Sequence, residues 1–213
     1  MTTNIGSVKL MLEEFYKGRA LWSYASGKRI PLFEDEVCII YRGIVRTQTL
    51  QPGGEESILG FMGPMMPVAR KFTLLNPYEV YALTHVDLLR LSWDEIERSD
   101  DLVRELNRSL IQRLRHTEVM LALLSKRQTS ERLIGFLSFL AQEYGKKTPQ
   151  GTRIEVQMTH QQIADAICTT RVTVTRLLGV LRKASLIKVG QDRGIYVMDE
   201  LSSNHDLDFS RMS

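Results

Sequence analysis

The segment SDDLVRELNRSLIQRLRHTEVMLALLSKRQ, residues 99–128, contains neither proline nor glycine and constrains this chain more than any other stretch. Residues recur along it at steps of three and four, which is the heptad-like pattern of a long helix packed on a partner helix. The seam consists of Val103, Leu106, Leu110, Arg113, Thr117, Met120 and Leu124. Such a helix is long for covering one small domain, so we expect it to dimerise. The alternative is an amphipathic helix that lies on its own domain.

Two polar residues, Arg113 and Thr117, interrupt this seam. Polar groups at seam positions weaken a pure zipper, so they either fix the register or meet something polar.

The residues before this helix indicate short strands. EVCIIYRG, IVRTQTLQ, EESILGFMG and EVYALTHVDLLRLS are β-rich, and QPGGEE is typical of a hairpin turn. Several short strands at this spacing, between about residues 21 and 91, predict a β-sandwich or a barrel-like roll. Residues 1–18 precede them and have the apolar spacing of a short helix.

The residues after the long helix alternate between helix and strand. QTSERLIGFLSFLAQEYG predicts a helix capped by Thr129 or Ser130 and ended by Gly145. KKTPQG predicts a loop, and TRIEVQ predicts a strand. IKVGQDRGIYVM predicts a two-strand hairpin around residues 190–194.

The segment between that strand and that hairpin is typical of a helix-turn-helix. Thr159 is a candidate N-cap for a short helix ending near Ile167, and a turn at Cys168 and Thr169 leads into a second helix from about Thr170 to Lys183. The expected apolar core is Ile163, Ala164, Ile167, Val174, Leu177, Leu178 and Leu181. With the hairpin as a wing, the unit predicts a winged helix-turn-helix that binds DNA.

The second helix begins with residues that favour DNA more than they favour a helix. Arg171 and Arg176 can each reach a base edge or a phosphate, and arginine binds guanine O6 and N7 bidentately. Threonine and valine methyl groups can contact thymine methyl groups, while threonine hydroxyls can bond phosphates. The candidate DNA-contacting residues are Thr159, His160, Gln161, Thr169, Thr170, Arg171, Val172, Thr173, Arg176 and Lys183. The alternative is a small helical subdomain with solvated arginines.

The charge and the cysteine content of the sequence argue against several other classes of protein. The net charge of +3 identifies no partner, but residues 153–198 hold seven Lys or Arg against three Asp or Glu, a net of +4. The chain has two cysteines far apart and four scattered histidines, which predicts neither a disulfide framework nor a metal site. No apolar run approaches the roughly 18 residues of a membrane span, and no signal peptide is evident, so we expect a cytoplasmic protein without a membrane partner.

The sequence contains no recognisable motif of a common enzyme class either. Neither a nucleophile elbow, a P-loop nor a GxGxxG motif is present, so we expect no catalytic activity. A second alternative is an adaptor that keeps this scaffold without affinity for DNA.

The helix-turn-helix unit THQQIADAICTTRVTVTRLLGVLRK resembles that of the CRP/FNR family, the cyclic-AMP receptor protein and its relatives. Within that family, TRVTVTRLLG, QRLRHTE and SERLIGFLSFL resemble the cyanobacterial global nitrogen regulators. The resemblance implies an α+β chain with a cupin-like β-roll (residues 1–92), a dimerisation helix (93–126) and a winged helix-turn-helix (127–213). It further implies a homodimer that binds double-stranded promoter DNA at a palindrome and works with RNA polymerase.

The resemblance also assigns roles at the recognition helix. Arg171 and Arg176 match the family's DNA-contacting arginines. Val172 stands where many members have a glutamate that reads cytosine, which implies a GTA…TAC-like half-site, as in the nitrogen-regulator branch. Cys168 stands at the family's usual glycine, where a small structural thiol is the simpler interpretation and a redox sensor the alternative.

The family's cyclic-nucleotide pocket resembles GPMMPV (residues 63–68) and NPYEVYA (residues 76–82) with its key residues replaced. Pro67 and Val68 stand in place of a glycine and the ribose-binding glutamate, and Asn76 and Pro77 replace the phosphate-binding pair. Proline offers neither a hydroxyl nor an N–H, so we expect no binding of cyclic AMP or cyclic GMP.

The nitrogen-regulator branch binds 2-oxoglutarate instead, and the chain retains part of that site. Arg113 and Glu118 match the helix pair that the partner subunit supplies, and Arg70 is near enough in sequence to replace the roll arginine lost at Asn76. We therefore expect 2-oxoglutarate as the effector, if there is one. The alternative is that Arg113 and Glu118 form a salt bridge between helices.

Overall fold

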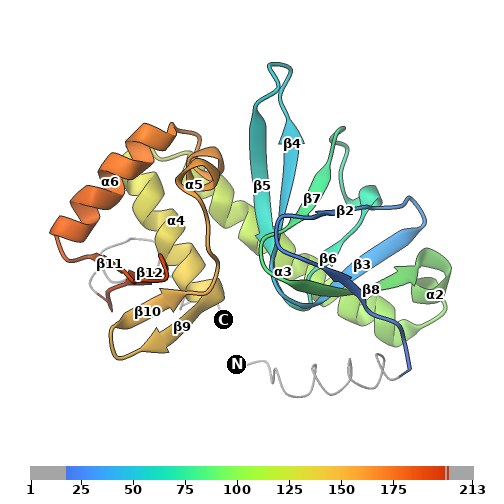
Figure 1. Ribbon diagram of the computed structural model, residues 1–213. Coiled ribbons are helices and arrows are strands. Elements are labelled where there is room, and N and C mark those ends of the chain that lie inside the picture. Colours follow the sequence, from blue (N-terminus) through green and yellow to red (C-terminus); the bar gives the residue numbers. More distant parts are fainter. Residues whose placement is uncertain (1–17, 200, 202–213) are drawn as a thin grey trace.

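The computed structural model describes residues 18–199 and residue 201. The helix expected over residues 1–18 therefore lies outside the described residues, apart from its last position. Strands form the first part of the described chain, a long helix crosses its middle, and helices mixed with short strands form its last part (Figure 1). This α+β arrangement is the fold class expected from the sequence. Among the described residues, no helix combines the length and apolar character needed to cross a membrane.

Two four-stranded antiparallel sheets form the roll. The first sheet has the order β1 (Trp22–Tyr24), β8 (Val86–Ser92), β3 (Glu36–Arg42) and β6 (Pro67–Val68). The second has the order β2 (Arg29–Ile30), β7 (Glu79–Ala82), β4 (Val45–Leu50) and β5 (Glu56–Met62). Their inner faces share a fully buried core that includes Ile40, Val80 and Leu88. The four β-rich stretches of the sequence are confirmed as strands.

The turn predicted at QPGGEE joins β4 to β5. Gln51 N–H donates to the Glu55 carbonyl over 2.9 Å, and Gly54 has a φ of +84°. A glycine adopts this left-handed conformation without the steric cost of a Cβ.

The long helix α3 (Asp100–Leu124) follows the short helix α2 (Trp93–Glu97). Its N-cap is Ser99, whose hydroxyl accepts from Leu102 N–H over 3.4 Å. Part of the seam from Val103 to Leu124 packs within its own chain, whereas Val103 and Thr117 of the same seam are exposed. Leu106 packs on the roll and Met120 is buried in the chain's own core.

Apolar side chains are exposed on α3 both at Val103 of the seam and outside the seam. Val103, Ile111, Leu114 and Leu121 have exposed fractions of 37%, 53%, 58% and 68%. The roll and the next helix cover part of the seam named from the sequence, at Leu106 and Met120. The spacing of apolar residues could not distinguish these covered positions from the exposed ones.

The helix α4 (Thr129–Tyr144) corrects one predicted cap. Its N-cap is Gln128, which makes no capping hydrogen bond through its side chain, and Thr129 is already the first helical residue. Gly145 ends the helix as expected, although in an extended conformation with a φ of −99°.

The loop predicted at KKTPQG is also wrong in its first half. Residues Gly145–Thr148 form strand β9, which pairs with β10 (Gly151–Ile154) and places Lys147 opposite Thr152. Pairing with the neighbouring strand outweighs the low strand preference of two lysines.

The last part of the chain is the expected helix-turn-helix followed by a hairpin. It consists of α5 (His160–Ala166), α6 (Arg171–Lys183), β11 (Ile187–Val189) and β12 (Ile195–Val197). These two strands join β10 and β9 in one sheet with the order β11-β12-β10-β9. The expected core residues of the unit are buried except for Leu177, which is partly buried against the same cluster.

The roll and the helix-turn-helix share one hydrophobic core. Phe61 of β5 packs on Phe136 of α4 with ring centroids 5.5 Å apart, and Tyr144 Oη donates to the Phe61 carbonyl over 3.0 Å. Ile58 of β5 and Ile163 of α5 belong to the same buried cluster. Helix α5 consequently lies beside β5 (Figure 1), so the roll contributes to the position of the helix-turn-helix.

Candidate nucleic-acid interface

The first helix of the motif begins with a capping box. Thr159 Oγ1 accepts from the backbone N–H of Gln162 over 3.1 Å, and Gln162 Oε1 accepts from Thr159 N–H over 2.9 Å. These two bonds satisfy N–H groups that a helix start otherwise leaves without partners. Ile163 and Ala164 then face the core, so the motif's first helix is fixed at both its start and its inner face.

The turn between the helices has its chain reversal at Cys168. This residue has a φ of 51°, and Thr169 N–H donates to the Ala164 carbonyl over 3.0 Å. The left-handed conformation explains why related motifs favour glycine there. Cys168 is exposed, and its thiol forms no disulfide.

The recognition helix α6 has one buried and one open face. Val174, Leu178 and Leu181 are buried at spacings of four and three. Arg171 and Arg176 are exposed, and Val172 is 78% exposed. The open face thus presents two arginines and an apolar side chain, which are residue types able to contact base edges.

Hydroxyl and amide contacts order the side chains around the start of α6. Thr170 is its N-cap and accepts from Thr173 N–H over 3.2 Å, while the two hydroxyls lie 2.9 Å apart. His160 Nδ1 lies 2.8 Å from Thr175 Oγ1 and joins the start of α5 to α6. Gln161 donates to Asp165 over 2.7 Å, which uses part of its amide within the helix.

Lys183, the last candidate contact, lies exposed in the final turn of α6. Its charge there suits the negative end of the helix dipole, whereas Arg171 and Arg176 lie towards the other end. Thr159 is the N-cap of α5, and the other nine candidate residues belong to α5, α6 or the turn between them.

The wing is held by an ion pair that the sequence analysis missed. Arg153 of β10 donates to Asp192, which also accepts from Gly194 N–H over 3.1 Å. The Gly194 hydrogen bond, followed by the Arg153 guanidinium, lowers the pKa of the Asp192 carboxyl below its ordinary value. Gln157 Nε2 donates to the Asp192 carbonyl over 3.2 Å. No spacing in the sequence indicates this pairing, because strand registry brings residues 153 and 192 together.

Arg132 of α4 is a second residue that the sequence analysis missed. It donates from Nη2 to the Cys168 carbonyl over 3.4 Å and from Nη1 to the Lys126 carbonyl over 3.1 Å. Arg132 thus joins the end of the long helix to the turn of the motif.

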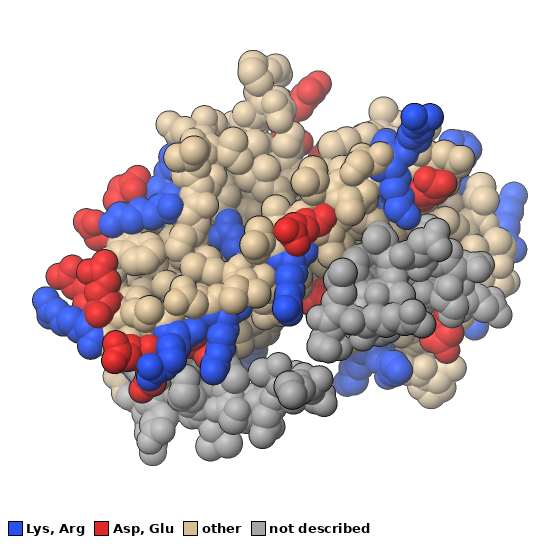
Figure 2. Space-filling model, turned by 180° about the vertical axis from the view of Figure 1, so that it is seen from behind, with Lys and Arg blue, Asp and Glu red and all other residues tan. Residues whose placement is uncertain are grey.

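The recognition arginines differ from those of the roll in their pairing. On the roll, Arg42 pairs with Asp87 over 2.7 Å and Arg90 with Glu36 over 2.7 Å. The rear view in Figure 2 shows blue and red side chains intermixed over the roll, on the left of the picture. Within the described part of the chain, Arg171 and Arg176 have no acidic partner. An unneutralised pair of arginines on an open helix face suits a polyanion.

The candidate effector residues Arg113 and Glu118 have different surroundings. Arg113 donates to the Pro67 carbonyl over 3.3 Å and to Tyr78 Oη over 3.0 Å, and it lies over the Phe72 ring. It is therefore directed at the roll of its own chain. Glu118 is exposed on α3, five residues further along.

Arg70 is also engaged within the roll. It donates to the Leu75 carbonyl over 2.8 Å and lies 3.8 Å from a Glu34 oxygen. Of the residues standing at the cyclic-nucleotide positions, Pro67 and Val68 are buried, whereas Asn76 and Pro77 are exposed.

Comparison with known proteins identifies relatives of the whole chain. A family model described as a Crp-like helix-turn-helix domain matches residues 131–201. The regulatory protein CysR of Synechococcus elongatus is 32% identical over 79% of this chain and 79% of its own length. The global nitrogen regulator of the same organism is 29% identical over 88% of this chain and 86% of its own length. The global nitrogen regulator of Synechocystis is 39% identical over 53% of this chain and 52% of its own length.

Solved structures share the fold. A CRP-family transcriptional regulator from Thermus thermophilus superposes with a TM-score of 0.74 at 22% identity, covering 86% of this chain and 97% of that one. A cyclic nucleotide-binding domain containing protein from Listeria monocytogenes superposes with a TM-score of 0.76 at 16% identity, covering 92% and 98%.

Proposed function

Because the chain belongs to the CRP/FNR family of DNA-binding transcription regulators, we propose that it binds a palindromic promoter site as a homodimer. In this proposal residues 1–92 are a sensor-like roll, residues 93–126 form the dimerisation helix and residues 127–213 bind DNA. The observation that carries it is the open face of α6, where Arg171 and Arg176 are exposed and have no acidic partner among the described residues.

The start of α6 enters the major groove in each half-site. A two-fold dimer places its recognition helices about 34 Å apart, which is one turn of DNA. The centres of the two half-sites therefore lie one turn apart. Val172 cannot accept a hydrogen bond from cytosine N4, which favours a GTA…TAC-like half-site over one of the TGTGA type. RNA polymerase is the partner through which a promoter-bound regulator acts.

The exposed face of α3 supports the homodimer. Ile111, Leu114 and Leu121 lie at helical spacings of three and seven, and each is more than half exposed in the single chain. A second copy of the same face would remove these side chains from water.

For the effector we propose a dicarboxylate rather than a cyclic nucleotide, with 2-oxoglutarate as the candidate. The buried Val68 and the Asn76–Pro77 pair argue against a nucleotide. Arg113 already has three contacts within its own roll, so a carboxylate would have to share it. That observation favours the alternative, in which regulation is independent of a small effector or controlled by a partner protein.

Arg176→Ala tests the assignment of sequence readout. We expect a loss of about 1–3 kcal/mol at the specific site and weaker preference there, because one arginine–base contact disappears. Lys183→Ala is the matched control, and it should weaken binding to specific and random DNA equally. Gel shifts over a series of salt concentrations measure both variants. An equal loss on both DNAs for Arg176→Ala would assign that residue to phosphates alone.

Promoter titrations with and without 2-oxoglutarate test the effector. A dicarboxylate effector should change the affinity of the wild-type protein for DNA and lose this effect in Arg113→Ala. An unchanged affinity at millimolar 2-oxoglutarate supports the effector-independent alternative.

A further inference from the structure

A cavity of about 220 Å³ lies between the roll and the helix-turn-helix. Its roll side includes Ser26, Arg46, Tyr81 and Leu83, and its other side includes Gln157, Thr159 and Gln162. It is separate from Arg113 and Arg70, which do not line it. The volume is below the roughly 300–1,000 Å³ of drug-sized ligand sites, so its occupant would be a small metabolite.

The charged group of this cavity is Arg46 of β4. Its side chain is only 10% exposed, and its guanidinium lies over the Tyr81 ring with its centre 5.0 Å from the ring centroid. Nη1 donates to Glu56 over 3.0 Å, and Glu56 is 41% exposed. Among the described residues this is the one hydrogen bond that the Arg46 guanidinium donates, which leaves its other N–H groups available at the cavity wall.

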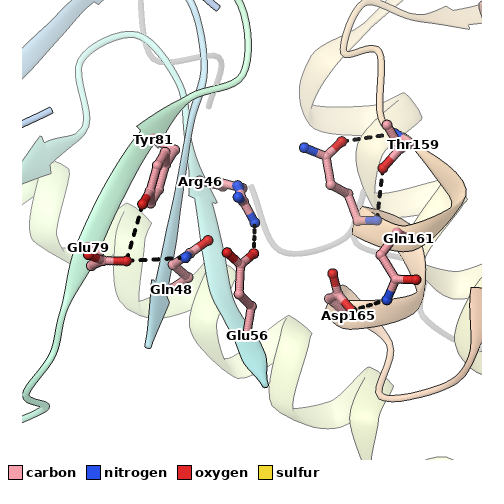
Figure 3. A network of polar contacts seen from close by, with 9 residues as sticks. Arg46, Gln48, Glu56, Glu79, Tyr81, Thr159, Gln161 and Asp165 are labelled. Carbon is pink, nitrogen blue, oxygen red and sulfur yellow. Dashed lines mark hydrogen bonds and ion pairs between the residues drawn. The ribbon is translucent and has the colours of Figure 1, made fainter. Parts of the chain in front are cut away.

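The opposite wall offers further hydrogen-bond donors. Gln162 uses Oε1 in the capping box, so its amide nitrogen remains a donor, and the Thr159 hydroxyl accepts one bond and retains its proton. Figure 3 shows Arg46 and Glu56 on the roll facing Thr159, Gln161 and Asp165 on α5 across this space. One cation and two neutral donors on facing walls match a ligand rich in acceptor oxygens.

We propose that this cavity binds a small oxyanion, either a carboxylate or a phosphate group of a metabolite, held by Arg46 from the roll and by Thr159 and Gln162 from α5. Arg46 is mostly removed from water and has a partly solvated counterion, so a second acceptor compensates its burial. The Tyr81 ring and Leu83 provide an apolar wall for the remainder of the ligand.

The position of the site couples it to the recognition helix. A ligand that contacts both β4 and α5 favours the arrangement in which α5 is docked on the roll, and α5 is followed directly by α6. Linkage is reciprocal, so a bound anion changes the affinity for DNA by the factor by which DNA changes the affinity for the anion. This coupling rests on the proposed function, whereas the anion site itself does not.

Titration calorimetry on the full chain tests the site, with inorganic phosphate and succinate as probes at constant ionic strength. We expect one binding event per chain, at millimolar or tighter affinity, for at least one probe. Binding of phosphate alone assigns the site to phosphate groups, and binding of succinate alone assigns it to carboxylates. Absence of binding for both probes at millimolar concentration would overturn the proposal.

Three variants locate the binding. Arg46→Gln should weaken it at least about tenfold, the effect of losing one charge-assisted hydrogen bond. Gln162→Glu should weaken it similarly, since glutamate preserves the capping box while repelling an anion. Arg42→Gln is the matched control, because Arg42 is a solvent-exposed roll arginine paired with Asp87 outside the cavity.

The outcomes separate this site from the proposed function. Retained affinity in both cavity variants, or an equal loss in Arg42→Gln, would mean that the probes bind elsewhere, and the proposal fails. The Gln162→Glu variant leaves the roll intact, so it remains informative if Arg46→Gln disturbs folding. Sequence-specific DNA binding by the wild-type protein without a probe tests the proposed function alone.

Discussion

Cys168 carries a conformational cost at the turn of the DNA-binding motif. Its φ of 51° places an L-residue in the left-handed region, at roughly 1–2 kcal/mol relative to a helical conformation. Glycine removes this cost but gains entropy in the unfolded chain, so Cys168→Gly should raise the free energy of unfolding by up to about 1 kcal/mol.

The counterpart at the same position is Cys168→Val. A β-branched side chain is the least compatible with positive φ, so this change should lower the free energy of unfolding by about 1–2 kcal/mol. Denaturant unfolding of the three proteins measures both effects. If the valine variant matched the glycine variant in stability, backbone conformation would not be what limits this residue.

At the scale of elements, two helical glycines have opposite surroundings. A Cβ on Gly135 of α4 would lie 2.2 Å from Cδ2 of Leu123 on α3, which is 1% exposed. Overpacking of this kind costs about 1–3 kcal/mol, against a helix-propensity gain of about 1 kcal/mol. Gly135→Ala should therefore lower the free energy of unfolding by about 1 kcal/mol, because it separates α3 from α4.

Gly179 of α6 supplies the control for that change. Nothing lies within 4 Å of a Cβ placed there, so Gly179→Ala should raise the free energy of unfolding by up to about 1 kcal/mol through helix propensity. Thermal unfolding measures the stability of both alanine variants relative to the wild-type protein. Equal stabilisation of the two would contradict the close approach of α3 and α4 at Gly135.

At the scale of the whole molecule, the exposed face of α3 predicts the oligomeric state. Ile111→Glu places a carboxylate in the proposed dimer contact from both copies and removes two apolar side chains worth about 1.5–3 kcal/mol each. The dimer should weaken at least about 100-fold, as measured by sedimentation equilibrium. Val180→Glu is the matched control, because Val180 and Ile111 are each 53% exposed. A wild-type monomer at micromolar concentration would refute the dimer itself.

The sequence by itself determined the order of the units and the position of the DNA-binding motif. Local signals suffice for this, since the Thr159 cap and the buried spacing of α6 depend on residues only a few positions apart. The same holds for the strand stretches, whose β-rich composition and turn residues are local. These predictions were confirmed because local and tertiary preferences agree there.

The tertiary structure alone decided which surfaces those elements cover. The seam of α3 fits a partner helix or the chain's own roll equally well by spacing, and the structure packs Leu106 on the roll and buries Met120 in the chain's own core. Likewise, Lys146 and Lys147 become a strand through pairing with β10. Arg153 meets Asp192, and Arg46 comes to line one cavity with Thr159, only after distant segments dock. Contacts between residues far apart in sequence depend on registry and packing, which local periodicity does not encode.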